Sequence, residues 1–118
     1  MSLLARVTEE SRGEEPVAVA AVAGEIDASN TLHVGDSLRS MLTNRSTALV
    51  VDLSGTTYLD SAAINLFFRL AGDLRQRQQR LLLVVPGTAP IARAIGITGL
   101  DTAVPVHGTR DDALADAA

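Results

Sequence analysis

The chain has 118 residues, of which 47% are hydrophobic and 20% charged, and its formal net charge is -4 at pH 7. This length and composition predict one folded domain, residues 1–118, rather than a disordered chain. The acidic charge disfavours nucleic acid as a partner, because that affinity depends on clustered cations, and the lack of cysteine excludes disulfides, thiol catalysis and cysteine-based zinc sites.

The sequence contains no segment typical of a membrane-spanning or secreted protein. No apolar run approaches the roughly 20 residues that a membrane-spanning helix needs. The N-terminus lacks the basic segment and following apolar stretch of a signal peptide. We therefore expect a soluble, cytoplasmic protein without a membrane partner.

The N-terminal part of the chain predicts a β-hairpin. Residues 3–8 alternate loosely between apolar and polar side chains, as an edge strand does, and residues 17–23 form a second apolar run. The polar, glycine-containing segment 9–16 between them predicts a turn. The two strands are therefore expected to pair with each other.

The first predicted helix follows the sequence Gly-Glu-Ile-Asp at residues 24–27. Asp27 or Ser29 is expected to cap this helix, which should run to about Thr43. Apolar residues recur on one face, and we expect that face to pack into the core: Val34, Leu38, Met41 and Leu42.

The central segment predicts a buried strand, a short loop and the start of a second helix. Residues 48–53 form an almost unbroken apolar run, typical of a strand covered on both faces, and Ser-Gly at 54–55 ends it. Asp60 and Ser61 precede a helix expected to reach about residue 79, and either side chain can cap its first turn. One stripe of this helix should face the sheet: Ala63, Leu66, Phe67, Leu70 and Leu74.

Ile64 and Phe68 lie outside that stripe, turned from it by about 100° or more. One interpretation is a wide core face or contact with a neighbouring helix. The other is an exposed hydrophobic patch beside the helix start, which would bind a partner.

The C-terminal part predicts two more strands, each followed by a helix. Residues 81–85 form a buried strand, and residues 104–106 a short edge strand in which proline is tolerated. Residues 88–95 and 109–117 have the pattern of helices.

Both C-terminal helices carry end signals. Gly96 and Gly99 are expected to end the first, and Thr109 or Asp111 to lie near the cap of the second. Strands that alternate with helices imply parallel pairs, and the N-terminal hairpin adds an antiparallel edge. The predicted fold is a single α/β domain with a mixed sheet of about five strands and about four helices.

Three segments together resemble the STAS domains, and in particular the bacterial anti-sigma factor antagonists. Residues 50–64, Val-Val-Asp-Leu-Ser-Gly-Thr-Thr-Tyr-Leu-Asp-Ser-Ala-Ala-Ile, are similar to the family signature. Residues 24–32 resemble the family's Gly-Glu-Leu-Asp turn into its first helix, and residues 90–100 its C-terminal helix and Gly-Leu turn. The resemblance covers nearly the whole chain and implies a STAS-like fold.

The resemblance also implies a phosphorylation site. In these antagonists the phosphoacceptor is the serine directly after the aspartate at this helix start, which falls on Ser61. Free backbone amides and the helix dipole at such a position favour an anion such as phosphate. Without the resemblance, the Asp60-Ser61 pair would be interpreted as a helix cap alone.

The family resemblance implies a regulatory protein rather than an enzyme. Unmodified protein would bind an anti-sigma factor that is also a serine kinase, and so free a sigma factor. Phosphorylation of Ser61 would release this partner, and a serine phosphatase would reverse the reaction. The ATP and Mg²⁺ would belong to the kinase, so no cofactor is expected here. The predicted partner-binding residues are Asp27, Asp60, Ser61, Ala62, Ala63, Ile64 and Phe68.

Two of these positions carry open questions. The family commonly has a small residue and then glycine after the phosphoacceptor, whereas this chain has Ala62 and Ala63, and the Ala63 methyl would crowd a closely approaching partner. Asp27 is either a neighbour of the phosphoacceptor that orients kinase contacts or simply a helix cap.

Two alternative functions remain at this point. STAS-like domains also occur as scaffold or ligand-sensing modules without a phosphoswitch. A receiver-like phosphoaspartate domain would use Asp52, Asp27 and Asp60 to hold Mg²⁺, but it also needs a lysine, and the chain has none.

Overall fold

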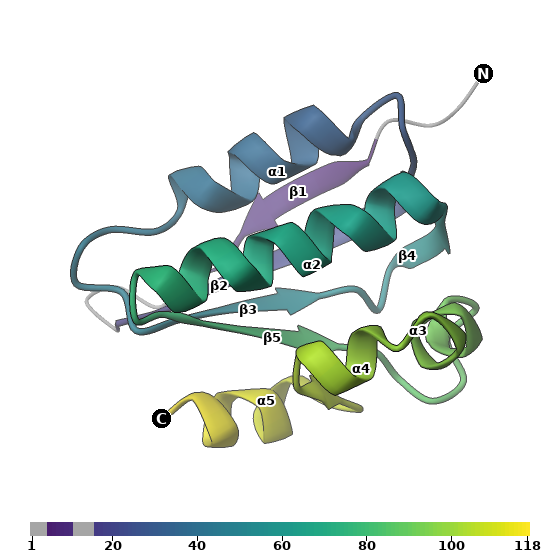
Figure 1. Ribbon diagram of the computed structural model, residues 1–118. Helices are drawn as coiled ribbons and strands as arrows, with labels where there is room; N and C mark the ends of the chain where they lie inside the picture. Colours follow the sequence, from purple (N-terminus) through teal and green to yellow (C-terminus); the bar gives the residue numbers. More distant parts are fainter. Residues whose placement is uncertain (1–4, 11–15) are drawn as a thin grey trace.

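A mixed sheet of six strands lies at the centre of the computed structural model, which describes residues 5–10 and 16–118 (Figure 1). Its strands are β1 (Arg6–Glu9), β2 (Val17–Ile26), β3 (Ala48–Asp52), β4 (Thr56–Leu59), β5 (Arg80–Val84) and β6 (Val106–His107). β1 pairs antiparallel with β2, and β2, β3, β5 and β6 follow as parallel neighbours. The predicted hairpin is confirmed, although residues 3, 4 and 11–15 lie outside the described part.

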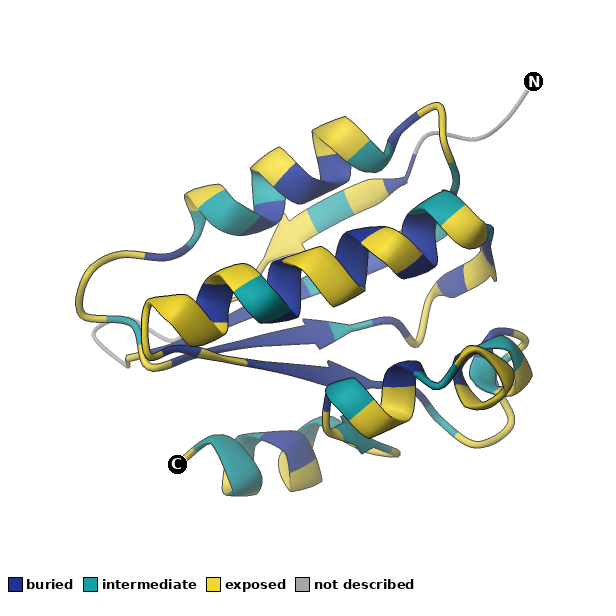
Figure 2. Cartoon of the chain, viewed as in Figure 1, coloured by how far each residue is buried: buried dark blue, intermediate teal, exposed yellow. Residues whose placement is uncertain are grey.

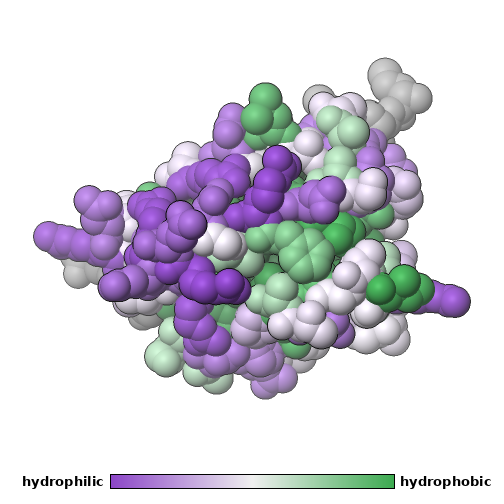
Figure 3. All heavy atoms as spheres, viewed as in Figure 1, coloured by the Kyte–Doolittle hydropathy of each residue, from purple (hydrophilic) through white to green (hydrophobic). Residues whose placement is uncertain are grey.

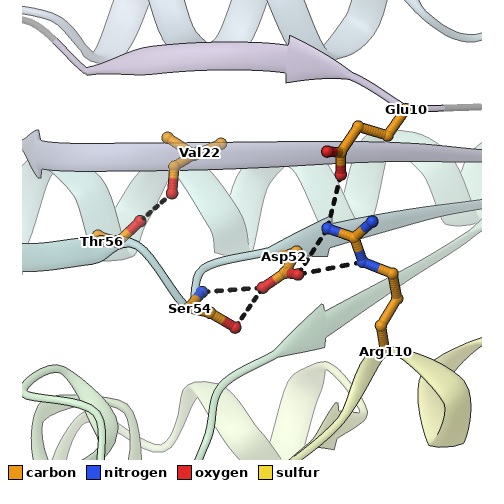
Figure 4. Close-up of polar contacts among 6 residues, drawn as sticks. All are labelled: Glu10, Val22, Asp52, Ser54, Thr56 and Arg110. Atoms are coloured by element: carbon orange, nitrogen blue, oxygen red, sulfur yellow. Dashed lines mark hydrogen bonds and ion pairs between the residues drawn. The ribbon is translucent and has the colours of Figure 1, made fainter.

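The strand β4 was not predicted, because the segment after Asp52 contains Ser-Gly and was interpreted as a loop. β2 is long enough to pair with β3 along its first half and with β4 near its end. The register shifts after Gly24, which has a positive φ of 98°. The buried hydroxyl of Thr56 donates a hydrogen bond of 2.7 Å to the carbonyl of Val22, which fixes β4 against β2 (Figure 4).

Five helices cover the two faces of this sheet unequally. They are α1 (Thr31–Ser40), α2 (Ser61–Gln76), α3 (Ala92–Thr98), α4 (Leu100–Ala103) and α5 (Arg110–Ala117). The first four contribute to the larger hydrophobic core on one face, whereas α5 lies alone on the other (Figure 1). In the described part of the chain, no helix is long and apolar enough to cross a membrane.

The larger core confirms the predicted faces of the first two helices. Figure 2 shows the buried residues along the sheet and the sheet-facing side of α2. Every residue of the predicted α2 stripe is buried, with Ala63, Phe67 and Leu70 fully inaccessible. Of the predicted α1 face, three residues are buried and one is partly buried: Val34, Leu38, Leu42 and Met41.

The last helices differ from the prediction in their boundaries. α3 begins at Ala92, after Pro90, and passes through Gly96 before Gly99 ends it with a left-handed φ of 77°. Gly96 was therefore wrongly expected to end the helix. The short α4 was not predicted, because it follows α3 directly. Thr109 caps α5 as expected, its side chain accepting from the amide of Asp112.

Candidate functional site

Ser61 is the first residue of α2, and its side chain is exposed. Asp60 occupies the N-cap position in an extended conformation, and its Oδ1 accepts a hydrogen bond of 2.9 Å from the amide of Ala63. The Asp60 carbonyl accepts from the amide of Ile64. The amides of Ser61 and Ala62 are thus left at the open end of the helix, where an anion is favoured.

Asp60 also joins this helix start to the loop that follows β2. Its Oδ2 accepts a hydrogen bond of 2.9 Å from the amide of Ala28, while its own amide donates to the carbonyl of Ile26. The two carboxylate oxygens therefore accept hydrogen bonds from two different backbone segments. Asp60 positions Ser61 relative to the β2–α1 loop, and that loop carries Asp27.

The β2–α1 loop is held by its own side chains. Asp27 Oδ1 accepts hydrogen bonds from the amide and the hydroxyl of Ser29. Asn30 is 2% exposed; its Oδ1 accepts from the Asp27 amide and its Nδ2 donates to the Glu25 carbonyl. Asn30 was not predicted from the sequence, although asparagine in the turn Asp-Ala-Ser-Asn is a recognisable turn signal.

The predicted cap of α1 was wrong. α1 starts at Thr31 with Asn30 at its N-cap position, and no side chain caps it. Asp27 and Ser29 instead bond to each other within the loop. The helix-cap interpretation of Asp27 is therefore excluded, and its carboxylate lies in the loop that Asp60 ties to the start of α2.

Of the two interpretations of Ile64, the wide core face is confirmed. Ile64 is 6% exposed and Ala63 is fully buried, so neither can present its side chain to a partner without rearrangement. The reason is the width of the covered arc, because α2 contacts α1 and α4 as well as the sheet. The Ala63 methyl packs in the core and cannot crowd an approaching partner.

The exposed side of α2 does carry an apolar patch. Phe68 is 36% exposed, and a hollow of about 370 Å³ beside it is lined by Ala62, Asn65, Phe68 and Arg69. Figure 3 shows hydrophobic atoms over the N-terminal half of α2 and hydrophilic atoms over its C-terminal half. We call Ser61 and three of these lining residues, Ala62, Asn65 and Phe68, the Ser61 surface.

Three further apolar side chains are exposed at elements near this surface. Leu32 lies in the first turn of α1, Tyr58 in β4 and Ile97 in α3. The first turn of α1, together with β4 and α3, lies at the end of the sheet where the parallel strands have their carboxyl termini (Figure 1). Ligands of open α/β sheets usually bind at this edge. These three residues were not predicted from the sequence, because a single exposed apolar side chain has no sequence signature.

A second polar cluster lies away from Ser61 and involves Asp52 (Figure 4). Asp52 Oδ2 accepts two hydrogen bonds from Arg110, one from Nε at 3.1 Å and one from Nη2 at 2.7 Å. Asp52 Oδ1 accepts hydrogen bonds from the amide and the hydroxyl of Ser54. Arg110 also pairs with Glu10. Burial alone would raise the pKa of Asp52, but these hydrogen bonds outweigh it and hold the pKa below its ordinary value.

This pairing argues against the receiver-like alternative. Asp52 is engaged by Arg110 and Ser54 rather than by Asp27 and Asp60. Among residues 5–10 and 16–118, no group of three or more histidines and carboxylates is arranged to hold a metal ion. The three carboxylates that a receiver-like domain would use, Asp52, Asp27 and Asp60, therefore do not form a Mg²⁺ site together.

Comparison with known proteins gives the family context. A family model described as "Mlab, STAS domain" matches residues 9–106. A protein of Listeria monocytogenes named anti-sigma-B factor antagonist is 33% identical over 91 residues, which cover 77% of this chain and 79% of that protein.

Solved structures share the whole fold. An anti-sigma factor antagonist from Mycobacterium paratuberculosis is 27% identical with a TM-score of 0.75, over 95% of this chain and 94% of that one. The phosphorylated form of SpoIIAA, a Bacillus cell fate determinant, has a TM-score of 0.65 at 14% identity, over 96% of this chain and all (100%) of that one. The second likeness concerns the fold alone.

Proposed function

The chain belongs to the STAS domain family, and we propose that it is an anti-sigma factor antagonist controlled by phosphorylation of Ser61. Unphosphorylated protein binds an anti-sigma factor that is also a serine kinase, and this binding frees a sigma factor for transcription. Phosphorylation releases the kinase, and a serine phosphatase restores the binding form. The names of the Listeria and Mycobacterium relatives support the first part of this proposal.

The observation that carries the phosphoswitch is the placement of Ser61. Its exposed hydroxyl stands at the N-terminus of α2, and the adjacent backbone is fixed by both oxygens of Asp60. A kinase can therefore reach the hydroxyl without unfolding the helix. The free amides of the first turn and the helix dipole stabilise the phosphate once it is attached.

The reaction needs nothing from this chain except the hydroxyl. Ser61 Oγ attacks the γ-phosphorus of ATP, the bond from that phosphorus to the bridging oxygen breaks, ADP leaves, and the hydroxyl proton passes to a base of the kinase. The phosphatase hydrolyses the phosphoserine with water to give serine and inorganic phosphate. ATP and Mg²⁺ belong to the kinase.

Release follows from charge rather than from refolding. The phosphate adds a charge of about -1.5 to -2 at pH 7. In the free protein it is solvated and stabilised by α2. In the complex it would be desolvated beside Asp60 and the loop of Asp27, where like charges repel. Phe68, the exposed apolar residue of the Ser61 surface, supplies the apolar contact that the phosphate interrupts.

The test is a calorimetric titration of the purified chain with anti-sigma factor kinases from the same genome. Ser61→Ala should bind like wild type, whereas Ser61→Asp should bind at least about tenfold more weakly, or about 1.4 kcal/mol. Asn44→Asp adds the same charge at an exposed position outside the Ser61 surface and should bind like wild type.

Mass spectrometry identifies the modified residue. After incubation with the kinase and ATP, wild type should carry one phosphate on Ser61, and Ser61→Ala should carry none. Equal affinities of Ser61→Ala and Ser61→Asp would reject the switch and leave a STAS scaffold or ligand-sensing module as the better interpretation.

A further inference from the structure

A groove of about 520 Å³ runs between α1 and α2. Its rim is formed by Leu32 and Arg39 of α1 and by Arg69, Asp73 and Gln76 of α2, with Leu66 and Gly72 also contributing to its walls. Arg69 also lines the hollow beside Phe68. The groove is therefore continuous with the Ser61 surface and extends it toward the C-terminal end of α2.

α1 and α2 lie close together at Gly35, and the groove is open at Gly72. A Cβ atom at Gly35 of α1 would lie 2.9 Å from Leu66 Cδ1, so a larger residue at this point would force the Leu66 side chain to move. At Gly72, six residues further along α2 from Leu66, a Cβ atom would meet nothing within 4 Å. The space above Gly72 is thus open, and no neighbouring group of the fold explains the missing side chain.

Gly72 is also unfavourable for α2 itself. It lies inside a 16-residue helix, and its φ is not positive. Glycine in a helix interior is destabilising relative to alanine. A helical glycine that faces an open groove is suited to the close approach of another chain.

The charges on the groove indicate the chemistry of that chain. Arg39 pairs with Asp73 across the groove at 3.0 Å, with both side chains well exposed. Arg69 forms no salt bridge with any described residue and stands on the rim. The groove therefore carries one uncompensated positive charge on a protein whose net charge is -4. An acidic ligand segment complements it.

We propose that this groove binds an acidic, amphipathic segment of the anti-sigma factor, as a second contact beside the one at Ser61. The inference rests on the proposed function for the identity of the partner. Gly72 lies 11 residues after Ser61, about 16 Å along the helix axis. Since the Debye length is about 8 Å at physiological salt, the phosphate hardly affects this contact.

The experiment uses four variants of α2 and the anti-sigma factor from the Ser61 titrations. Gly72→Met fills the groove, and Gly72→Ala is its control, since both remove the helical glycine. Arg69→Glu reverses the rim charge, and Arg75→Glu is its control, because Arg75 lies on the same helix outside the groove. Circular dichroism confirms that each variant is folded.

Gly72→Met and Arg69→Glu should weaken binding at least about tenfold, while both controls stay within about twofold of wild type. Introduced into Ser61→Asp, the groove variants should produce the same fold-changes. If Gly72→Met binds as tightly as Gly72→Ala, and Arg69→Glu as tightly as Arg75→Glu, the groove is not a contact site.

The outcomes separate the two proposals. Loss of binding by the groove variants with no effect of Ser61→Asp rejects the phosphoswitch and supports the groove, and the reverse pattern rejects the groove alone. If no anti-sigma factor binds, the proposed function fails. NMR titration with an amphipathic peptide then tests whether the groove binds an acidic segment. A glutamate-bearing peptide should shift the amides of Leu66, Arg69 and Gly72, and its lysine counterpart should not; absence of this difference overturns the proposal.

Discussion

Different forces hold the helices on the two faces of the sheet. On the face of α1 to α4, large apolar side chains such as Phe67, Leu70 and Leu100 are completely buried. On the other face, α5 buries only Ala113 fully, with Leu114 and Ala117 partly buried against the strands. Apolar packing fixes the first face, and α5 depends on polar contacts at its two ends.

Those polar contacts are ion pairs of Arg110 and Arg80 and a hydrogen bond between His107 and Asp116. Arg110 joins the start of α5 to Asp52 and Glu10, and Asp116 joins its end to Arg80 and His107. Exposed ion pairs contribute little to the free energy of unfolding, and salt screens them. The contribution of buried apolar side chains does not depend on charge or on pH. α5 is therefore the part of the described fold that should respond first to acid and salt, while Ser61 is positioned on the insensitive face.

The largest effect is expected from a cavity in the packed face. Phe67→Ala should lower the free energy of unfolding by about 3–5 kcal/mol, because it removes a fully buried aromatic side chain. Urea unfolding followed by circular dichroism measures this change. Phe68→Ala, one residue further on but 36% exposed, should cost about 1 kcal/mol or less. Similar losses for the two would show that the packed face does not dominate stability.

This packed face was also the part best predicted from the sequence. The stripe of α2 repeats over several turns, so its periodicity alone indicated which residues are buried. Two interpretations of Ile64 stayed open because the burial of a residue outside the stripe depends on the neighbouring helices, whose positions no local pattern gives. β4 was missed because it is only four residues long and its pairing partner is the end of β2.

The candidate site was predicted in its chemistry but not in its contacts. Asp60 and Ser61 were recognised from the helix start and from the family resemblance. The bond from the Ala28 amide to Asp60 joins residues 32 positions apart, and that from Arg110 to Asp52 residues 58 positions apart. Such contacts follow from the topology of the sheet, which sequence periodicity does not specify.

A smaller effect is expected from the start of α5. Asp52→Asn should lower the free energy of unfolding at pH 7 by about 1–2 kcal/mol, because it removes a charged hydrogen-bond acceptor that is only 13% exposed. Its partner Arg110 is 37% exposed, so solvent screens part of the interaction. Glu10→Gln, which removes the other and more exposed partner of Arg110, should cost less.

Acid titration sharpens the same prediction. The pKa of Asp52 is lowered from 3.8 in the folded state, so its contribution is complete above the unfolded value and is lost as the pH falls through the lower folded value. Wild type should therefore lose stability below about pH 4 more steeply than Asp52→Asn. If the urea midpoints of the two proteins fall equally as the pH is lowered through this range, Asp52 does not make the attachment of α5 dependent on pH.

The smallest effect is expected at the end of α5. Hydrogen bonds from His107 and Arg80 lower the pKa of Asp116, but these groups are partly exposed and the pairs are screened by solvent. Asp116→Asn should leave the urea midpoint nearly unchanged while speeding hydrogen exchange of the α5 amides, including that of Ala118, which donates to the Leu114 carbonyl. Wild type in about 1 M salt, where the Debye length falls to about 3 Å, should exchange like the variant. A global loss of stability as large as that of Asp52→Asn would instead mean that α5 is fixed equally at both ends, and that its attachment is cooperative with the packed face.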